Sequence, residues 1–225
     1  MKKITAIQVV VANVCHLKYT TEINDTIDVA SKERGTGIAR RTNEYINSKI
    51  LEGKAIIAMD GNQFAGFCYI ESWGHNRFVA NSGLIVKKEY RGMGLAKEIK
   101  EKAFELSRRK FPDAKIFGLT TGLAVMKINH ELGYRPVTFS ELTDDEDFWK
   151  GCRSCVNYDI LQRTNRTKCL CTGMLFDPAW GKGRNAGPGK SKKVSLLEMI
   201  GRLRTKNGNN AKEQGTGLFR KARQA

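Results

Sequence analysis

The stretch EYRGMGLAKEIKEKAFEL, residues 89–106, decides the fold that we expect for this chain. Gly92 and Gly94 stand directly before a segment whose apolar residues recur at helical spacing. Glycine is a poor helix former, so two glycines at this point need a physical reason. Backbone amides at a helix N-terminus bind phosphate, and glycine lets a ligand approach them closely. The stretch therefore predicts a phosphate-binding turn, to which Arg91 adds a full positive charge.

Three other interpretations of the turn are open. A dinucleotide-binding fingerprint needs a third glycine at position 97, where this chain has Lys97. A nucleotide P-loop needs Gly-x-x-x-x-Gly-Lys-Ser/Thr, which the stretch lacks. A glycine-rich helix start that serves packing alone is the third alternative.

The rest of the sequence predicts strands and helices that alternate around this turn. Asp60-Gly61 indicates a hairpin between two apolar strands, and Thr42 is a helix cap. We expect strands at 4–14, 55–60, 63–73, 77–86, 115–120 and 136–142, helices at 19–33, 42–51, 95–106, 124–132 and 144–151, and a closing hairpin of 156–164 with 168–176.

Arg91-x-x-Gly94-x-Ala96, placed between a strand and an amphipathic helix, resembles the acyl-CoA pyrophosphate loop of the GNAT family of N-acyltransferases. The order of the expected elements over about residues 4–176 is similar to that family. The resemblance implies an α+β fold, an α/β/α sandwich whose mixed, mostly antiparallel sheet has a splayed strand pair. It also implies acetyl-CoA or another acyl-CoA, such as succinyl-CoA, as co-substrate. By resemblance the pyrophosphate lies on Arg91, Gly92, Met93, Gly94, Leu95 and Ala96, and the pantetheine arm lies on Leu84, Ile85 and Val86.

Three further stretches are similar to the acetyltransferase domain of N-acetylglutamate synthases: GIARRTNEY (37–45), GLTTGLAVMKINHELGYRPV (118–137) and CRSCVNYDIL (152–161). This similarity implies an acidic amino acid as acceptor, glutamate above all, and a role in arginine biosynthesis. The residues it assigns to the acceptor are Arg40, Arg41, Arg153 and Ser154. The alternatives are a protein or ribosomal-protein N-acetyltransferase, or a non-catalytic module that binds acyl-CoA or RNA.

The catalytic residues are less well defined by the sequence. Many GNAT enzymes use a tyrosine to protonate the leaving thiolate, and the matching position here is Asn129. Glu71 and His75 stand where a strand reaches its turn, and either could take the proton of the acceptor amine directly or through water. The alternative is that both are simply polar residues of a hairpin end.

Four late cysteines, Cys152, Cys155, Cys169 and Cys171, raise the question of zinc. The first pair has ligand spacing, but one residue between the second pair would point both thiols to the same side of a strand. We therefore predict no metal site, with structural zinc as the alternative. Six cysteines and no secretion signal lead us to expect reduced thiols and a cytoplasmic protein.

Positive charge is concentrated at the end of the chain, although the whole sequence carries a net charge of +16. From position 172 onward there are 12 Lys and Arg against 3 Asp and Glu. We predict an acyltransferase domain at 1–176 and a basic, disordered tail at 177–225. A tail without a dedicated partner and a tail that contacts nucleic acid weakly are the two alternatives. We expect no membrane association, and a homodimer remains open.

Overall fold

The computed structural model describes residues 6–34 and 41–182 of the 225 in the chain. Its strands are β1 (Ile7–Val11), β2 (Ala55–Asp60), β3 (Gln63–Trp73), β4 (Phe78–Val86), β5 (Lys115–Thr120), β6 (Arg135–Val137) and β7 (Thr172–Phe176). Its α-helices are α1 (Thr20–Arg34), α2 (Asn43–Leu51), α3 (Leu95–Lys110), α4 (Leu123–Glu131), α5 (Glu146–Lys150), α6 (Tyr158–Arg163) and α7 (Ala179–Lys182). Short 3-10 turns lie at Val14–Tyr19, Lys88–Tyr90, Phe139–Glu141 and Gly151–Ser154.

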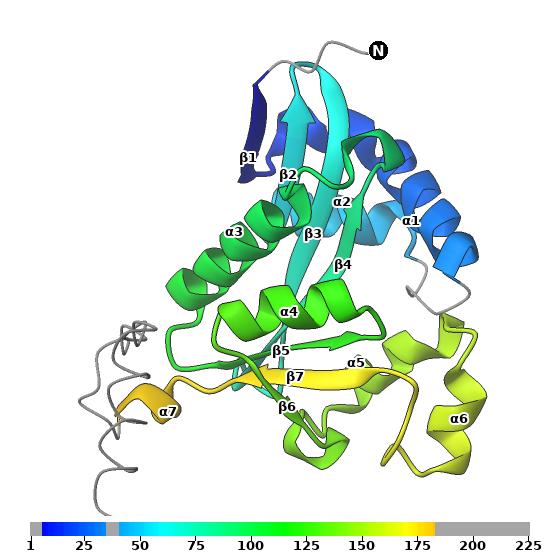
Figure 1. The fold of residues 1–225 in the computed structure, drawn as a ribbon, viewed down its shortest axis with the longest axis vertical. Coiled ribbons are helices and arrows are strands. Elements are labelled where there is room, and N and C mark those ends of the chain that lie inside the picture. Colours follow the sequence, from blue (N-terminus) through cyan, green and yellow to red (C-terminus); the bar gives the residue numbers. More distant parts are fainter. Residues whose placement is uncertain (1–5, 35–40, 183–225) are drawn as a thin grey trace, which may run out of the picture. The chain divides into compact units, whose positions relative to one another are not determined.

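The strands form one sheet in the order β1-β2-β3-β4-β5-β7-β6. All neighbours are antiparallel except β4 and β5, which are parallel and pair only between Phe78–Ala80 and Lys115–Phe117. Beyond Ala80, β4 continues beside β3 while β5 turns away with β7, so the two strands diverge (Figure 1). This splayed pair opens the middle of the sheet.

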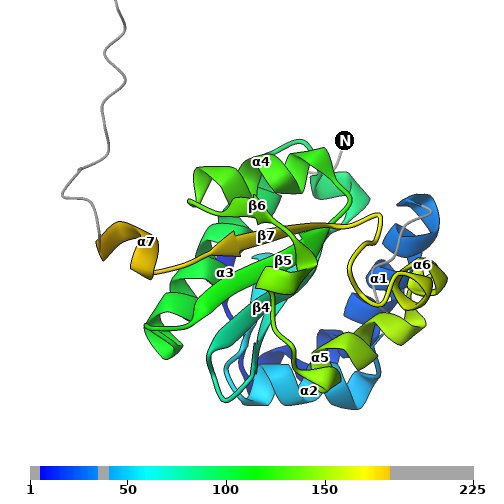
Figure 2. The same cartoon turned by 90° about the horizontal axis from the view of Figure 1, so that it is seen from below.

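The two faces of the sheet carry separate apolar cores because alternate residues of a strand point to opposite sides. On β2, Ile56 and Ala58 pack with the apolar stripe of α3, whereas Ile57 packs with α1 and α2. A third cluster joins β5 and β7 to α5 and α6 around Trp149 and Leu161. Helices α3 and α4 therefore cover one face, and α1, α2 and α5 lie on the other (Figure 2).

A β-bulge interrupts β4 beside the splay. Tyr69 pairs with Ser82 and Phe67 pairs with Ile85, so Gly83 and Leu84 together face a single residue of β3. Gly83 has φ of 67°, in the left-handed region that favours glycine. An ideal Cβ on Gly83 would lie 2.6 Å from the ring of Tyr69. Both the backbone angle and the packing therefore require glycine at this position.

The predicted α+β architecture with a splayed strand pair is confirmed, and so is the local structure around the predicted caps and turns. Thr42 accepts a hydrogen bond from the backbone of Tyr45 at the start of α2, and the Asp60-Gly61 hairpin joins β2 to β3. The predicted strand at 136–142 is a three-residue strand, Arg135–Val137, followed by a 3-10 turn.

The predicted closing hairpin is wrong. Residues 158–163 form helix α6, which buries Leu161 and leaves Val156 exposed. Strand β7 is already hydrogen-bonded to β5 on one side and β6 on the other, so no edge remains for another partner.

The predicted domain boundary at position 176 stays a prediction. Asp177 forms an ion pair with Lys115, and Trp180 packs against the cluster around Trp149. The tail beyond residue 182 lies outside the described residues. Within the described part of the chain, no helix is both long and apolar enough to cross a bilayer.

Replacing Gly83 by alanine should destabilise the fold more than replacing Gly61. Both glycines have positive φ, but within the described part of the chain nothing lies within 4 Å of an ideal Cβ on Gly61. We expect Gly61→Ala to cost about 1 kcal/mol of unfolding free energy from backbone strain, and Gly83→Ala to cost about 1–3 kcal/mol more from the clash with Tyr69. Urea unfolding of the two variants measures the difference, and equal losses would contradict the close packing at the bulge.

Candidate functional site

The glycine turn links β4 to α3 and has the conformation that only glycine adopts easily. Gly92 and Gly94 have φ of 81° and 82°. Tyr90, which is buried, anchors the turn by donating its hydroxyl to Asp60 Oδ2 at 3.1 Å. The two glycines therefore bend the chain sharply into the first turn of α3.

The backbone amides of residues 92–96 have no hydrogen-bond acceptor among the residues that the structure describes. The first amides to bond within α3 are those of Lys97 and Glu98, which donate to the carbonyl of Gly94. Residues 91–94 are exposed, and no atom of the described residues lies within 4 Å of an ideal Cβ on either glycine. A 16-residue helix thus presents a free, positively polarised end to solvent.

Arg91 lies at the edge of this turn. Its Nε donates to the carbonyl of Val86 at 3.1 Å, and its Nη1 is 2.9 Å from Glu33 Oε2 of α1. These contacts hold the guanidinium beside the end of β4, and both charged groups remain accessible to solvent.

A cavity of about 460 Å³ opens where β4 and β5 diverge. Its middle is formed by Asn81–Leu84 of β4 and by residues 118–121 at the end of β5. Lys100, Val125 and Asn129 line it from the face covered by α3 and α4. Arg41, Tyr45, Tyr69 and Glu71, together with residues of α5 and α6, line it from the other face. The cavity therefore connects the two sides of the sheet.

Among the residues predicted to bind the acceptor, Arg41 lies in the cavity wall. Its Nε donates to the hydroxyl of Tyr69 at 2.9 Å, and its guanidinium lies over the ring of Tyr45 at 5.4 Å from the centroid. Arg40 lies outside the described residues. Arg153 and Ser154 are exposed, and Arg153 lines a separate hollow of about 250 Å³ with Glu146 and Arg166. The structure thus does not bring Arg153 and Ser154 into the cavity.

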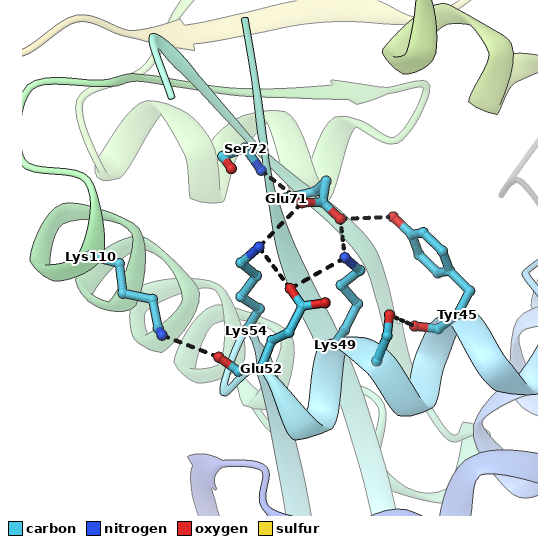
Figure 3. Close-up of polar contacts among 8 residues, drawn as sticks. Tyr45, Lys49, Glu52, Lys54, Glu71, Ser72 and Lys110 are labelled. Carbon is cyan, nitrogen blue, oxygen red and sulfur yellow. Dashed lines mark hydrogen bonds and ion pairs between the residues drawn. The ribbon is translucent and has the colours of Figure 1, made fainter. Parts of the chain in front are cut away.

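The two residues predicted as catalytic bases lie in different surroundings. Glu71 lines the cavity, but its carboxylate forms ion pairs with Lys49 and Lys54 and accepts from the hydroxyl of Tyr45 at 3.4 Å (Figure 3). His75 is exposed in the β3–β4 turn and is not among the residues that line the cavity.

The charged groups around Glu71 form a closed network. Lys49 and Lys54 also contact Glu52, at 3.6 and 2.7 Å, so that two lysines and two glutamates alternate at the end of α2 (Figure 3). Lys49 and Glu71 keep only 7% and 13% of their side-chain surface exposed. The network fixes the C-terminal end of α2 to β3, at the cavity wall that Arg41, Tyr45 and Tyr69 also line.

The four late cysteines all line the cavity. Burial, reinforced by the neighbouring thiols, raises the pKa of Cys152 to about 11 and that of Cys171 to about 12. The described residues include no group of three or more His, Cys, Asp or Glu side chains placed to hold a metal ion. Cys152 and Cys171 are therefore neutral thiols near pH 7, and the four cysteines form a weakly polar wall.

Sequence reasoning missed Lys100 and the burial of Asn129. Lys100 is only 2% exposed although it lies on α3, and Asn129 is 1% exposed with its Oδ1 unpartnered among the described residues. Helical spacing places Lys100 beside the apolar stripe of α3. A lysine at such a position usually extends its charged end to water, so the sequence gives no reason to expect it in a cavity.

Residues 40–124, which include β4, the glycine turn and α3, match the sequence model of the acetyltransferase (GNAT) family. This part of the chain is therefore similar to GNAT acetyltransferases, which agrees with the resemblance found in the sequence. No curated protein sequence matches the chain significantly.

Solved structures share the fold at low sequence identity. The N-acetylglutamate synthase of Neisseria gonorrhoeae, in complex with coenzyme A and N-acetyl-glutamate, has a TM-score of 0.55 and 13% identity over 78% of this chain. The match covers 36% of the synthase, so this chain spans about a third of its length. A Mycobacterium tuberculosis protein in complex with CoA has a TM-score of 0.54 and 14% sequence identity, and the match covers 76% of this chain and 98% of that protein. A Salmonella typhimurium protein with acetyl-CoA has a TM-score of 0.53 and 12% sequence identity, and the match covers 83% of this chain and 99% of that protein.

Removing the negative charge of Glu71 should destabilise the protein strongly. Glu71→Gln leaves the buried ammonium of Lys49 with only the more distant Glu52, and we expect a loss of about 3 kcal/mol in unfolding free energy. Glu105→Gln, which breaks an exposed pair with Lys102, is the control and should cost less than about 0.5 kcal/mol. Chemical denaturation compares the two, and similar small losses would show that the network contributes little.

Proposed function

We propose that this protein transfers an acyl group from acyl-CoA to the amine of a small acceptor that carries a carboxylate. The observation that carries the proposal is the set of unengaged amides at residues 92–96, which lies beside a strand gap that opens into a cavity. Three structures with the same fold contain CoA or acetyl-CoA, which supports this assignment.

The residues present fit acyl-CoA. The glycine turn offers amide donors and a helix dipole to a pyrophosphate, and Arg91 adds a cation at its edge. Leu84, Ile85 and Val86 lie on the part of β4 that has no partner on its β5 side, where an extended amide chain would find backbone groups to pair with. Bound in this way, acyl-CoA supplies an activated thioester.

The acceptor side combines one firmly held cation with aromatic walls. Arg41 provides a planar donor for a carboxylate, and Tyr45, Tyr69, Trp73 and Phe148 surround the space beside it. Glutamate, with a place in arginine biosynthesis, is the acceptor that the sequence predicts. Because Arg153 and Ser154 lie outside the cavity, an amino acid with one carboxylate and an apolar or aromatic side chain is the second candidate.

Release of free CoA thiol tests the function directly. Purified protein and acetyl-CoA are incubated with glutamate, glutamine, aromatic amino acids and a peptide with a free N-terminus, and the thiol is followed colorimetrically. We expect acceptor-dependent release with a free amino acid. Release with the peptide alone would replace the proposed acceptor class by a protein substrate, and no release with any amine would refute the transferase assignment.

Replacing Arg41 by methionine should weaken acceptor binding selectively. We expect the KM for the acceptor to rise about 10- to 100-fold, since a buried charge-assisted contact is worth about 1.5–3 kcal/mol. The KM for acetyl-CoA should stay within about twofold. Arg153→Met is the matched control and should leave both constants unchanged. A larger effect of Arg153→Met than of Arg41→Met would assign the acceptor to the other hollow.

Replacing Arg91 by alanine should weaken CoA binding about 10-fold, the loss expected for one charge-assisted contact to phosphate. Isothermal titration calorimetry with CoA measures the change. Arg77→Ala removes an exposed arginine from the β3–β4 turn and serves as the control. Unchanged CoA affinity in Arg91→Ala would show that Arg91 does not contribute to phosphate binding.

A further inference from the structure

Lys100 is a buried amine without a counter-charge. Lys100 lies on α3 and is only 2% exposed. Within the described ranges it forms neither an ion pair nor a hydrogen bond. Its Nζ lies over the ring of Tyr134, 5.4 Å from the centroid. A charged group in such a place is costly unless an opposite charge or a hydrogen-bond acceptor pairs with it, and a ligand can supply that partner. Because Lys100 lines the cavity, a ligand in the cavity can reach it.

The amine lies at the point where the two strands separate. Ala80 and Phe117 form the last paired position of β4 and β5, and Asn81 and Gly118 are the next residues on each strand. An ideal Cβ on Gly118 would lie 3.7 Å from Lys100 Nζ and 3.5 Å from the carbonyl of Asn81. The missing side chain of Gly118 thus leaves room for the lysine head group at the apex of the gap.

Lys100 approaches the gap from the side of the sheet on which α3 packs, and the glycine turn begins this same helix. Arg41, Tyr45 and Glu71 approach from the side on which α1 and α2 pack. The amine therefore lies on the same side of the sheet as α3 and the glycine turn, and it faces the cavity from the side opposite Arg41.

Two titratable groups face Lys100 among the described residues, and both are neutral near pH 7. Cys68 of β3 has its pKa raised to about 11 by burial, and burial also raises the pKa of Tyr134 well above its ordinary value. Burial in turn lowers the pKa of Lys100 to about 8, with a small opposing effect of Cys68. At pH 7 the amine is mostly protonated, yet it gives up its proton more easily than an exposed lysine.

We propose that Lys100 is the acid that protonates the departing sulfur of the acyl donor, an inference that rests on the proposed function. As the new amide bond forms and the carbon–sulfur bond breaks, an Nζ–H bond of Lys100 breaks and an S–H bond forms on the thiolate. Lys100 is left as a neutral amine and regains a proton from water, while the acceptor amine loses one to solvent or a base. Asn129, which stands at the position matching the tyrosine of many GNAT enzymes, has an amide that cannot supply this proton at neutral pH.

The test compares Lys100→Met with Lys102→Met, an exposed lysine of the same helix. We expect Lys100→Met to lower kcat by about 10²- to 10⁴-fold, as for loss of a general acid, while the Kd for CoA changes less than about threefold. Lys102→Met should leave both within about twofold. If Lys100→Met does not fold, Lys100→Gln takes its place.

The pH profile distinguishes proton transfer from a structural role. Because the protonated amine is the active form, kcat of the unaltered protein should fall as pH rises through about 8, the pKa of Lys100. The residual activity of Lys100→Met should lack this fall, and Lys100→Arg should shift it to higher pH. An unchanged profile and unchanged kcat in Lys100→Met would overturn the inference and leave the transferase function intact.

A binding measurement tests the contact without turnover. The ultraviolet absorbance of the thiolate reports ionisation of bound CoA as pH is raised. The ammonium of Lys100 should stabilise the thiolate, so bound CoA should ionise at lower pH in the unaltered protein than in Lys100→Met. Identical titrations would overturn the inference whether or not acyl transfer occurs, whereas absence of transfer with every acceptor would refute the proposed function separately.

Discussion

The short parallel pairing between β4 and β5 is the constraint on which the rest of the structure depends. The two strands share only three paired positions, Phe78–Ala80 with Lys115–Phe117, and then separate. A continuous pairing would close the sheet and fill the space that the cavity now occupies. The same separation leaves the end of β4 that leads into the glycine turn without a β5 partner, and it opens the cavity whose wall includes Arg41.

A buried polar chain stabilises the point of separation. Asn81 donates to Ser107 at 2.8 Å and accepts from the hydroxyl of Tyr134 at 2.9 Å, and Ser107 donates in turn to the carbonyl of Ala103. These bonds satisfy polar groups that the apolar face of α3 could not. The side chain that follows the last paired position of β4 is thereby fixed to α3, and the gap opens at a defined residue.

Local signals in the sequence were sufficient for most of the fold. Thr42, the Asp60-Gly61 turn and the two glycines before α3 each specify a backbone geometry through their own chemistry, so their elements could be predicted one at a time. The strand expected at 156–164 could not be judged in this way, because its alternation fits a strand and only the occupied edges of β7 exclude it.

Only the part of the site that consists of contiguous backbone, the glycine turn, was predictable from the sequence. The turn at residues 91–96 is contiguous in sequence, whereas the cavity joins segments far apart, from Arg41 to Cys171. Lys100 carries no local signal, because whether a helical lysine reaches water or a cavity depends on the neighbouring strands. Arg153 shows the converse: its position in the sequence is close to that of Cys152, yet the 3-10 turn directs it to another hollow.

The bulge at Gly83 couples the two ends of the cavity mechanically. The ring of Tyr69 rests against the bare Cα of Gly83, and its hydroxyl holds the guanidinium of Arg41. Any movement of β4 at this point displaces the ring, and the ring carries the cation with it. Strand β4 and the guanidinium of Arg41 are therefore joined through a single aromatic ring, and a change in the cavity wall at Gly83 reaches Arg41 through that ring.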